Sequence, residues 1–211
     1  MTLLINGIKI SLMRRLFTFL FLIFFSFSAS PFADDIKDFE IEGMSIGDSL
    51  LDYMSKESIL KIKPNQQIYT DDKFYLIASG NNMFIEPSIF DYFRFHLKKD
   101  DNFYKIYSVS GALNFGFDGF NRCIEKKNEV IKDIVKIFGK EKKTEGKLIN
   151  HWYDKTGDSK TISTWFNLDN GEITVLCYDW SAELAKKNSW EDTLEIIVSI
   201  EEFVDWKDNL R

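Results

Sequence analysis

The chain has 211 residues, with 27 basic and 33 acidic side chains, a net charge of −6 and an aromatic content of 16 %. That aromatic content, together with only 3 Pro and 11 Gly, excludes collagen-like, low-complexity and disordered chains. Because the chain has no excess of basic residues, nucleic acid is not an expected partner.

Residues 1–33 have the three parts of a secretory signal peptide. Arg14 and Arg15 precede an apolar stretch over 16–27, and small residues lead to Ala33. A run of about 12 apolar residues is shorter than the roughly 20 that cross a bilayer, so an uncleaved anchor is the weaker alternative. We expect cleavage after Ala33, no stable membrane span in the mature chain, and a periplasmic or secreted location.

The remaining 34–211 is expected to form a single domain. Met13 also has the context of a start, which would make 1–12 an upstream extension. Cleavage removes three of the 27 basic residues and no acidic one, which leaves 24 against 33 and a net charge of −9. The segments 36–114 and 118–211 each begin with a predicted helix and continue into strands, so a tandem duplication is an alternative description of this domain.

Cys123 and Cys177 are the two cysteines of the chain. An even pair in an exported protein indicates a disulfide. The first lies near the start of a predicted helix and the second on a predicted strand, so the bond would link helix to sheet. The alternative is two buried thiols that pack as small apolar side chains.

The first half of the domain predicts a helix followed by strands. A Ser-x-x-Asp capping pattern opens a helical region over 45–62, which is interrupted near Ser55. Alternating apolar residues predict a strand over 73–79 and a hairpin formed by 92–97 and 103–113.

The second half predicts the same order around a longer helix. Asp118 is placed to cap a helix over 119–138, and Gly139 to end it in the left-handed conformation. Ser199 with Glu202 forms a capping pattern for a short terminal helix. The other predicted elements are strands over 147–153, 161–168 and 172–180, a short helix over 182–187 and a strand over 193–198. Antiparallel meander strands packed against one long and several short helices indicate an α+β fold.

Residues 47–50 read Gly-Asp-Ser-Leu, which resembles the signature of the Gly-Asp-Ser-Leu lipases and esterases. The resemblance covers four residues and implies a nucleophilic role for Ser49 alone. The family's late Asp-x-x-His block does not occur, and the histidines of the chain are His96 and His151. A motif needs its structural context, so we expect Ser49 at a helix start and no catalytic residue. A periplasmic or secreted hydrolase with Ser49 and His151 is the alternative function.

Large rings recur on three neighbouring predicted strands, at Trp152, Tyr153, Trp165, Tyr178 and Trp180. Strand alternation places rings on both faces of the sheet, so one face would meet the helices and the other could expose rings to a partner. A core filled from both sides is the favoured interpretation, because rings are common core fillers, and the exposed patch is the alternative.

The sequence offers no set of metal ligands and no phosphate-binding glycine loop, so we expect neither a metal nor a cofactor. The prediction is a soluble exported protein of a bacterial envelope. Its expected role is to bind a protein, a peptide or a glycan rather than to act as an enzyme.

Overall fold

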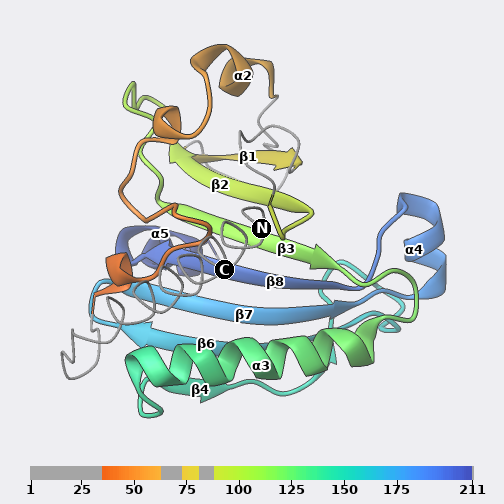
Figure 1. The fold of residues 1–211 in the computed structure, drawn as a ribbon. Helices are drawn as coiled ribbons and strands as arrows, with labels where there is room; N and C mark the ends of the chain where they lie inside the picture. The colour runs from red at the N-terminus through yellow and green to blue at the C-terminus, as the bar shows by residue number, and fades with distance from the viewer. Residues whose placement is uncertain (1–34, 63–72, 81–87, 211) are drawn as a thin grey trace, which may run out of the picture. The chain divides into compact units, whose positions relative to one another are not determined.

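One antiparallel sheet of eight strands organises the protein (Figure 1). The computed structural model describes residues 35–62, 73–80 and 88–210. The strand order is β1-β2-β3-β8-β7-β6-β4, and β5 pairs with β6 beside β4. The predicted signal peptide, 1–33, lies outside the described residues, as does the alternative start at Met13. Within the described ranges, no helix is both long enough and apolar enough to span a bilayer.

The elements confirm the α+β prediction. The strands are β1 (Phe74–Gly80), β2 (Tyr92–Lys98), β3 (Ser108–Asn114), β4 (Lys143–Glu145), β5 (Ile149–Asn150), β6 (Lys160–Leu168), β7 (Gly171–Asp179) and β8 (Thr193–Ile200). The helices are the 3-10 turns η1 (Ile36–Asp38) and η2 (Leu50–Asp52), and the α-helices α2 (Lys56–Lys61), α3 (Phe120–Phe138), α4 (Ala182–Asn188) and α5 (Glu201–Asp208). The three strands β1-β2-β3 and the three strands β8-β7-β6 meet where β3 pairs with β8. A tandem duplication of the two halves of the domain stays a prediction.

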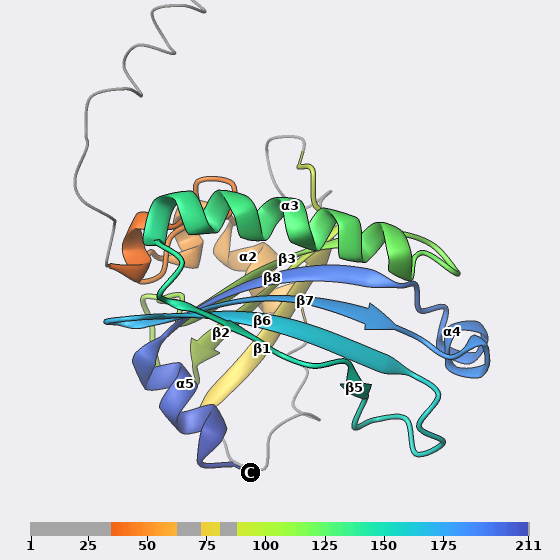
Figure 2. The ribbon, with the colours of Figure 1, turned by 90° about the horizontal axis from the view of Figure 1, so that it is seen from below.

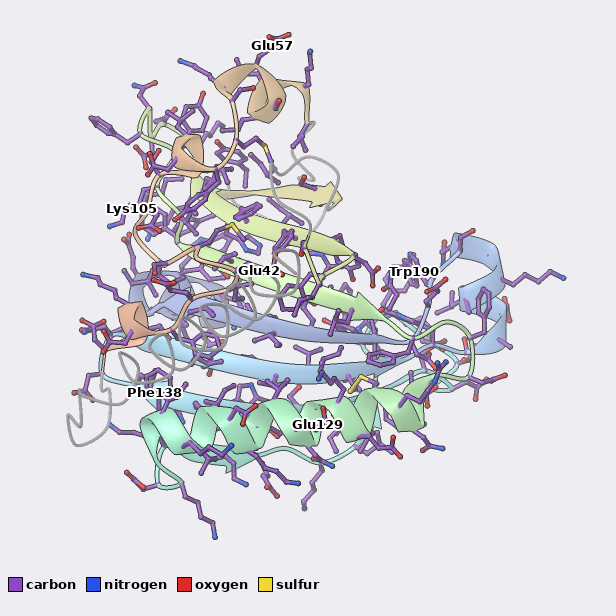
Figure 3. The ribbon with its side chains drawn as sticks, in the orientation of Figure 1. Glu42, Glu57, Lys105, Glu129, Phe138 and Trp190 are labelled. Atoms are coloured by element: carbon purple, nitrogen blue, oxygen red, sulfur yellow. A yellow bond between two sulfur atoms is a disulfide. The ribbon has the colours of Figure 1, made fainter. Side chains whose placement is uncertain are left out.

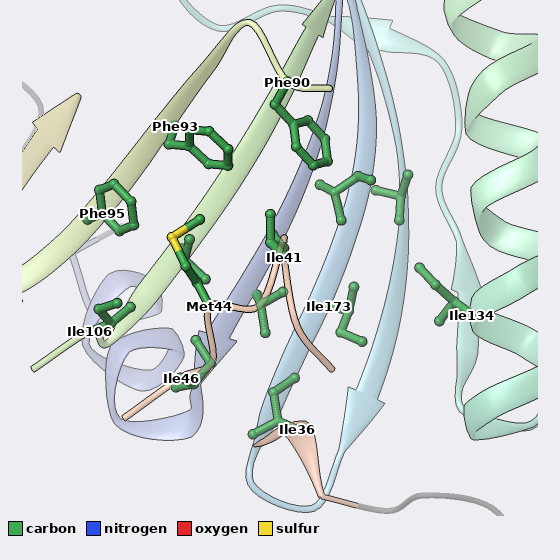
Figure 4. Packing of buried hydrophobic residues seen from close by; sticks show 14 of the residues in the cluster. Ile36, Ile41, Met44, Ile46, Phe90, Phe93, Phe95, Ile106, Ile134 and Ile173 are labelled. Carbon is green, nitrogen blue, oxygen red and sulfur yellow. The ribbon is translucent and has the colours of Figure 1, made fainter. Parts of the chain in front are cut away.

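The main core lies between one face of the sheet and a layer formed by α3 and the chain before α2 (Figure 2). From α3, Ile134 and Phe138 are buried against strands β7 and β8. Ile41 and Met44, from the chain before α2, belong to the same buried cluster as Phe93 on β2 (Figure 4). Each such side chain contributes about 1.5–3 kcal/mol by leaving water. This face therefore supplies most of the apolar burial that stabilises the fold.

The disulfide prediction is confirmed. Cys123 on α3 and Cys177 on β7 form the bond, with their Cα atoms 6.0 Å apart. Both side chains are fully buried within the main core. The bond therefore fixes the long helix to the sheet, as the sequence indicated.

Helix α5 covers part of the other face of the sheet (Figure 2). A smaller apolar cluster forms there from Phe74, Tyr107, Phe203 and Trp206. The His96 ring lies against the Phe203 ring, with 4.5 Å between their centroids. The sheet is thus covered on both sides by helices, with α3 and α5 on opposite faces.

The predicted helix over 45–62 is wrong in its first part. Asp48 does accept a hydrogen bond from the Ser45 N–H at 2.9 Å, so half of the capping pattern forms. However, Gly47 has a φ of 95°, and its N–H donates to the Ile106 carbonyl instead of to a helical turn. Backbone pairing with the β2–β3 connection replaces the helix here, and helical structure is confined to η2 and α2.

Three predicted helix ends also differ. Asp118 has a φ of 59° and does not cap α3, because Gly119 is the N-cap and makes no side-chain cap bond. Gly139 has the expected positive φ, 86°, but its ψ of 159° lies outside the left-handed helical region. Ser199 does not cap α5, because its hydroxyl shares a 2.9 Å hydrogen bond with Ser108 across the sheet.

Two strand predictions need larger corrections. The strand over 147–153 is reduced to Ile149–Asn150, and the strand at Lys143–Glu145 was not predicted. The strand over 103–113 begins only at Ser108, because the preceding residues form a connection in which Tyr104 has a φ of 53°. The other predicted strands agree with the structure within two residues.

Candidate binding site

Six rings gather at the end of the sheet where β7 stops and β8 begins. This ring cluster consists of Tyr178 and Trp180 from the end of β7, His151, Trp152 and Tyr153 from the turn after β5, and Trp190 from the connection before β8. The Trp180 centroid lies 4.4 Å from that of Trp190 and 4.6 Å from that of His151. Figure 3 places Trp190 beside α4.

Four exposed apolar side chains lie within residues 148–153, the segment that contains β5 and the turn carrying part of this cluster. The edge patch, as we call it, comprises Leu148 (52 % exposed), Ile149 (58 %), Trp152 (72 %) and Tyr153 (46 %). Behind it, the His151 ring is buried. Large apolar side chains gathered at one exposed edge are typical of a surface that contacts another molecule.

Asp154 organises the loop that presents Trp152 and Tyr153. Its carboxylate accepts hydrogen bonds from the hydroxyl and amide groups of Ser159 (2.6 and 2.9 Å) and of Thr156 (2.7 and 2.9 Å). These bonds, led by the Ser159 hydroxyl, hold the pKa of Asp154 well below its ordinary value. The loop takes the place of the predicted strand, so the two rings follow one another in a turn instead of alternating across a sheet.

An ion pair between a buried carboxylate and a partly exposed guanidinium lies behind the rings on the same face of the sheet. Both oxygens of Glu195, which is 2 % exposed, lie 2.8 Å from the guanidinium of Arg94. The hydroxyls of Ser110 and Tyr178 also donate to this carboxylate, at 2.6 and 3.3 Å. Burial, and then the negative charge of Glu195, raise the pKa of the Tyr178 phenol well above its ordinary value, so the phenol remains a hydrogen-bond donor. Tyr178 thus joins the ring cluster to a rigid polar support.

Beside Trp180, a pocket of about 420 Å³ lies between the β3–α3 connection and α4. Its lining includes the aromatic residues Phe117 and Trp180, the acidic residues Asp118 and Asp192, and the basic residue Lys186. Trp180 therefore belongs both to the pocket and to the ring cluster. The volume lies within the range typical of ligand pockets in proteins, roughly 300–1,000 Å³.

The structure brings together four of the five rings that the sequence singled out, namely Trp152, Tyr153, Tyr178 and Trp180. Trp165 lies apart, on β6, where its ring covers Gly146 closely enough that a Cβ there would come within 2.8 Å. Two members of the cluster, His151 and Trp190, were not among the predicted rings. Trp190 lies in a connection, and His151 falls in a predicted strand whose alternation separates it from Trp152.

Ser49 and His151 lie toward opposite ends of the sheet. Ser49 caps η2, where its hydroxyl donates to the Phe103 carbonyl at 2.6 Å and accepts from the Leu51 N–H at 3.2 Å, just before β3 begins. The His151 ring contacts the Tyr178 ring. Tyr178 pairs with Thr193 on β8, and Thr193 pairs with Asn114, the last residue of β3, so His151 lies near the other end of that strand. Seven strand residues span about 20 Å. The structure therefore does not bring the two residues of the alternative hydrolase together.

Comparison with known proteins gives no relative: no family model matches the chain, and neither curated proteins nor solved structures show a significant match. Within the part of the chain that the structure describes, His, Cys, Asp and Glu side chains form no group of three or more that could hold a metal ion.

Proposed function

We propose that this is an exported protein of the bacterial envelope, periplasmic or secreted, that binds a polypeptide partner through the edge patch. The signal-peptide pattern of 1–33 supports export. The buried disulfide also supports it, because such bonds persist in oxidising compartments.

The observation that carries the proposal is the exposure of Leu148, Ile149, Trp152 and Tyr153 at one edge of the sheet. Tryptophan and tyrosine supply much of the binding energy at protein interfaces when a partner covers them. The aliphatic pair favours a polypeptide over a glycan, since sugar recognition uses ring faces and hydrogen-bonding groups.

The support behind the patch also favours binding. Asp154 fixes the loop, and Tyr178 ties the ring cluster to the ion pair. A surface that is already ordered loses less conformational entropy when it binds. The separation of Ser49 from His151 supports binding over the hydrolase alternative.

A retention experiment tests the proposal. The chain, expressed at full length in its host, is isolated from the envelope, immobilised, and exposed to envelope extract. We expect a partner that is retained by the wild type and lost with the double variant Trp152→Ala/Tyr153→Ser. Phe103→Ser is the matched control, because Phe103 is 80 % exposed but lies by η2, away from the patch.

Equal retention by the double variant and the wild type would contradict the proposal. Mass measurement of the isolated protein tests export separately, with a mature chain that begins at Asp34 as the expected result. Turnover of p-nitrophenyl esters that is lost with Ser49→Ala would instead favour the hydrolase.

A further inference from the structure

We infer that the pocket between the β3–α3 connection and α4 receives a cationic side chain, a guanidinium or an ammonium group, of the polypeptide partner. This inference rests on the proposed function and names the chemistry that the partner presents next to the edge patch.

The carboxylate of Asp192 is the fixed element of the pocket. The side chain is only 3 % exposed, and its Oδ1 accepts a hydrogen bond from the backbone N–H of Trp180 at 2.9 Å. This is the one hydrogen bond that the Asp192 side chain makes within the described ranges. The carboxylate therefore keeps acceptor capacity, and Asp192 is one of the residues that line the pocket.

The backbone around the pocket is held in place on both sides. The Asp192 N–H donates to the Gly116 carbonyl at 3.2 Å, and the Phe115 N–H donates to the Asp192 carbonyl at 2.8 Å. Two of the lining residues, Asp118 and Ser189, have φ values of 59° and 54°. The pocket walls are thus formed by a connection whose shape is set by hydrogen bonds to the start of β8.

The charge in and around the pocket favours a cation. Asp118 and Asp192 outnumber Lys186 among its lining side chains. Burial, and then the negative charge of Asp192, raise the pKa of the neighbouring Asp179, with Asp118 adding to the effect and Lys160 opposing it. The same negative charges that disfavour an ionised carboxylate at this place would attract the positive charge of a ligand.

The rings supply the second part of the recognition. Phe117 is 61 % exposed at the pocket, and Trp180 lines it from the ring cluster. A guanidinium or an ammonium group near aromatic rings is attracted to their π faces. Carboxylates combined with rings match a side chain that carries a positive charge on an apolar stem, such as that of arginine or lysine.

The position of the pocket links it to the edge patch. From Trp180, ring contacts run through Trp190, at 4.4 Å, to Tyr153, at 5.3 Å between centroids. A polypeptide that covers Tyr153 therefore lies close enough to place one side chain in the pocket. This continuity favours a polypeptide over a free small cation as the source of the charge.

Binding of defined probes to the full-length chain isolated from the envelope tests the inference. The probes are acetyl-Leu-Ile-Arg-Leu-amide, the same peptide with citrulline in place of arginine, and acetyl-arginine-amide. Binding is followed through tryptophan fluorescence, because Trp180 lines the pocket. We expect the arginine peptide to bind about tenfold more tightly than the citrulline peptide, which corresponds to about 1.4 kcal/mol, and more tightly than acetyl-arginine-amide.

Variants locate the effect. Asp192→Asn keeps an oxygen for the Trp180 N–H and should remove most of the preference for arginine, and Asp118→Asn should weaken it as well. Lys186→Gln should strengthen binding of the arginine peptide. Asp133→Asn, on the exposed side of α3, is the matched control and should change nothing. If Asp192→Asn fails to fold, Asp118→Asn, at an exposed position, still decides the question.

Equal affinity for the arginine and citrulline peptides would overturn the inference, as would an unchanged preference in Asp118→Asn. Acetyl-arginine-amide binding as tightly as the peptide would overturn the assignment to a polypeptide. If Trp152→Ala/Tyr153→Ser retains the partner while the arginine preference persists, the proposed function fails and the cation site stands. If the preference is absent while the patch variant loses the partner, the inference alone fails.

Discussion

The face of the sheet under α3 is dominated by aliphatic and aromatic side chains. The opposite face buries a carboxylate and several hydroxyls among its rings and pairs that carboxylate with a partly exposed guanidinium. Both faces come from the same strands, because successive side chains point to opposite sides. On β2, Phe93 and Phe95 enter the main core, and Arg94 between them pairs with Glu195 on the other side.

The difference between the faces shows two ways to hold a sheet together. Apolar packing is a sum of many contacts, and the loss of one leaves the others in place. A buried polar network depends on each of its members, because a charge left without its partner keeps its desolvation penalty. The faces should therefore respond differently to substitution.

The largest effect is expected on the polar face. Arg94→Met leaves the carboxylate of Glu195 buried without its cation, which should cost about 3–5 kcal/mol of the free energy of unfolding. The double variant Arg94→Met/Glu195→Leu should recover most of that loss, since no buried charge remains. Urea denaturation measures both, and a single variant within 1 kcal/mol of wild type would remove the contrast between the faces.

The next effect concerns the face under α3. Replacing Cys123 and Cys177 together with alanine should lower the free energy of unfolding by about 2–4 kcal/mol, because the unfolded chain loses its crosslink. Denaturation with and without dithiothreitol measures it. The reductant should destabilise the wild type and leave the double variant unchanged, and equal stability of the two proteins without reductant would refute the prediction.

A smaller, pH-dependent effect belongs to the polar face. Burial, and then the positive charges of Arg94 and Lys207, lower the pKa of His96 to about 3 from its ordinary value of 6.5. Between these two pKa values His96 is protonated in the unfolded state but not in the folded state. The free energy of unfolding therefore falls as the pH drops below 6.5. We expect a loss of about 2–3 kcal/mol by about pH 4.5.

His96→Phe should flatten this dependence, as measured by thermal unfolding across the same pH range. The control is His151→Phe, which removes a histidine whose pKa is also lowered, first by burial, and should leave most of the slope. An unchanged slope in His96→Phe would show that other groups set the acid sensitivity.

The smallest effect on stability is expected at the edge patch. Trp152→Ala should change the free energy of unfolding by less than about 0.5 kcal/mol, because the side chain is mostly exposed. Trp180→Ala, inside the ring cluster, should cost several times more. Comparable losses for the two variants in urea would mean that Trp152 supports the fold and not a partner.

Much of the sheet could be predicted from local pattern. Alternation of apolar residues identified β1 and β2, turn residues helped to delimit β6 and β7, and the three- and four-residue spacing identified α3. The two cysteines indicated the crosslink. The strands and the helix could be predicted because their patterns involve residues close in sequence. The disulfide could be predicted because an even pair of cysteines in an exported protein usually forms a bond. The same alternation placed Arg94 and His96 on the face away from Phe93 and Phe95.

The errors arose where distant segments decide local structure. The stretch before η2 pairs with the connection that contains Ile106. Its backbone N–H groups donate to that connection and therefore do not form the hydrogen bonds of a helix. The turn after β5 follows the hydrogen bonds of Asp154 rather than the alternation of its rings. Arg94 and Glu195 are 101 positions apart, and no local pattern connects them. The candidate site was therefore predicted in composition but not in arrangement.

The position of β8 in the sheet determines when the two groups of strands can join. Among the described residues β8 is the last strand in sequence, yet it lies between β3 and β7 and not at a margin of the sheet. Until residues 193–200 leave the ribosome, the strands made earlier form two separate groups with open inner edges, and such edges are prone to aggregation. The sheet therefore cannot be completed before residues 193–200 are available to join the two groups.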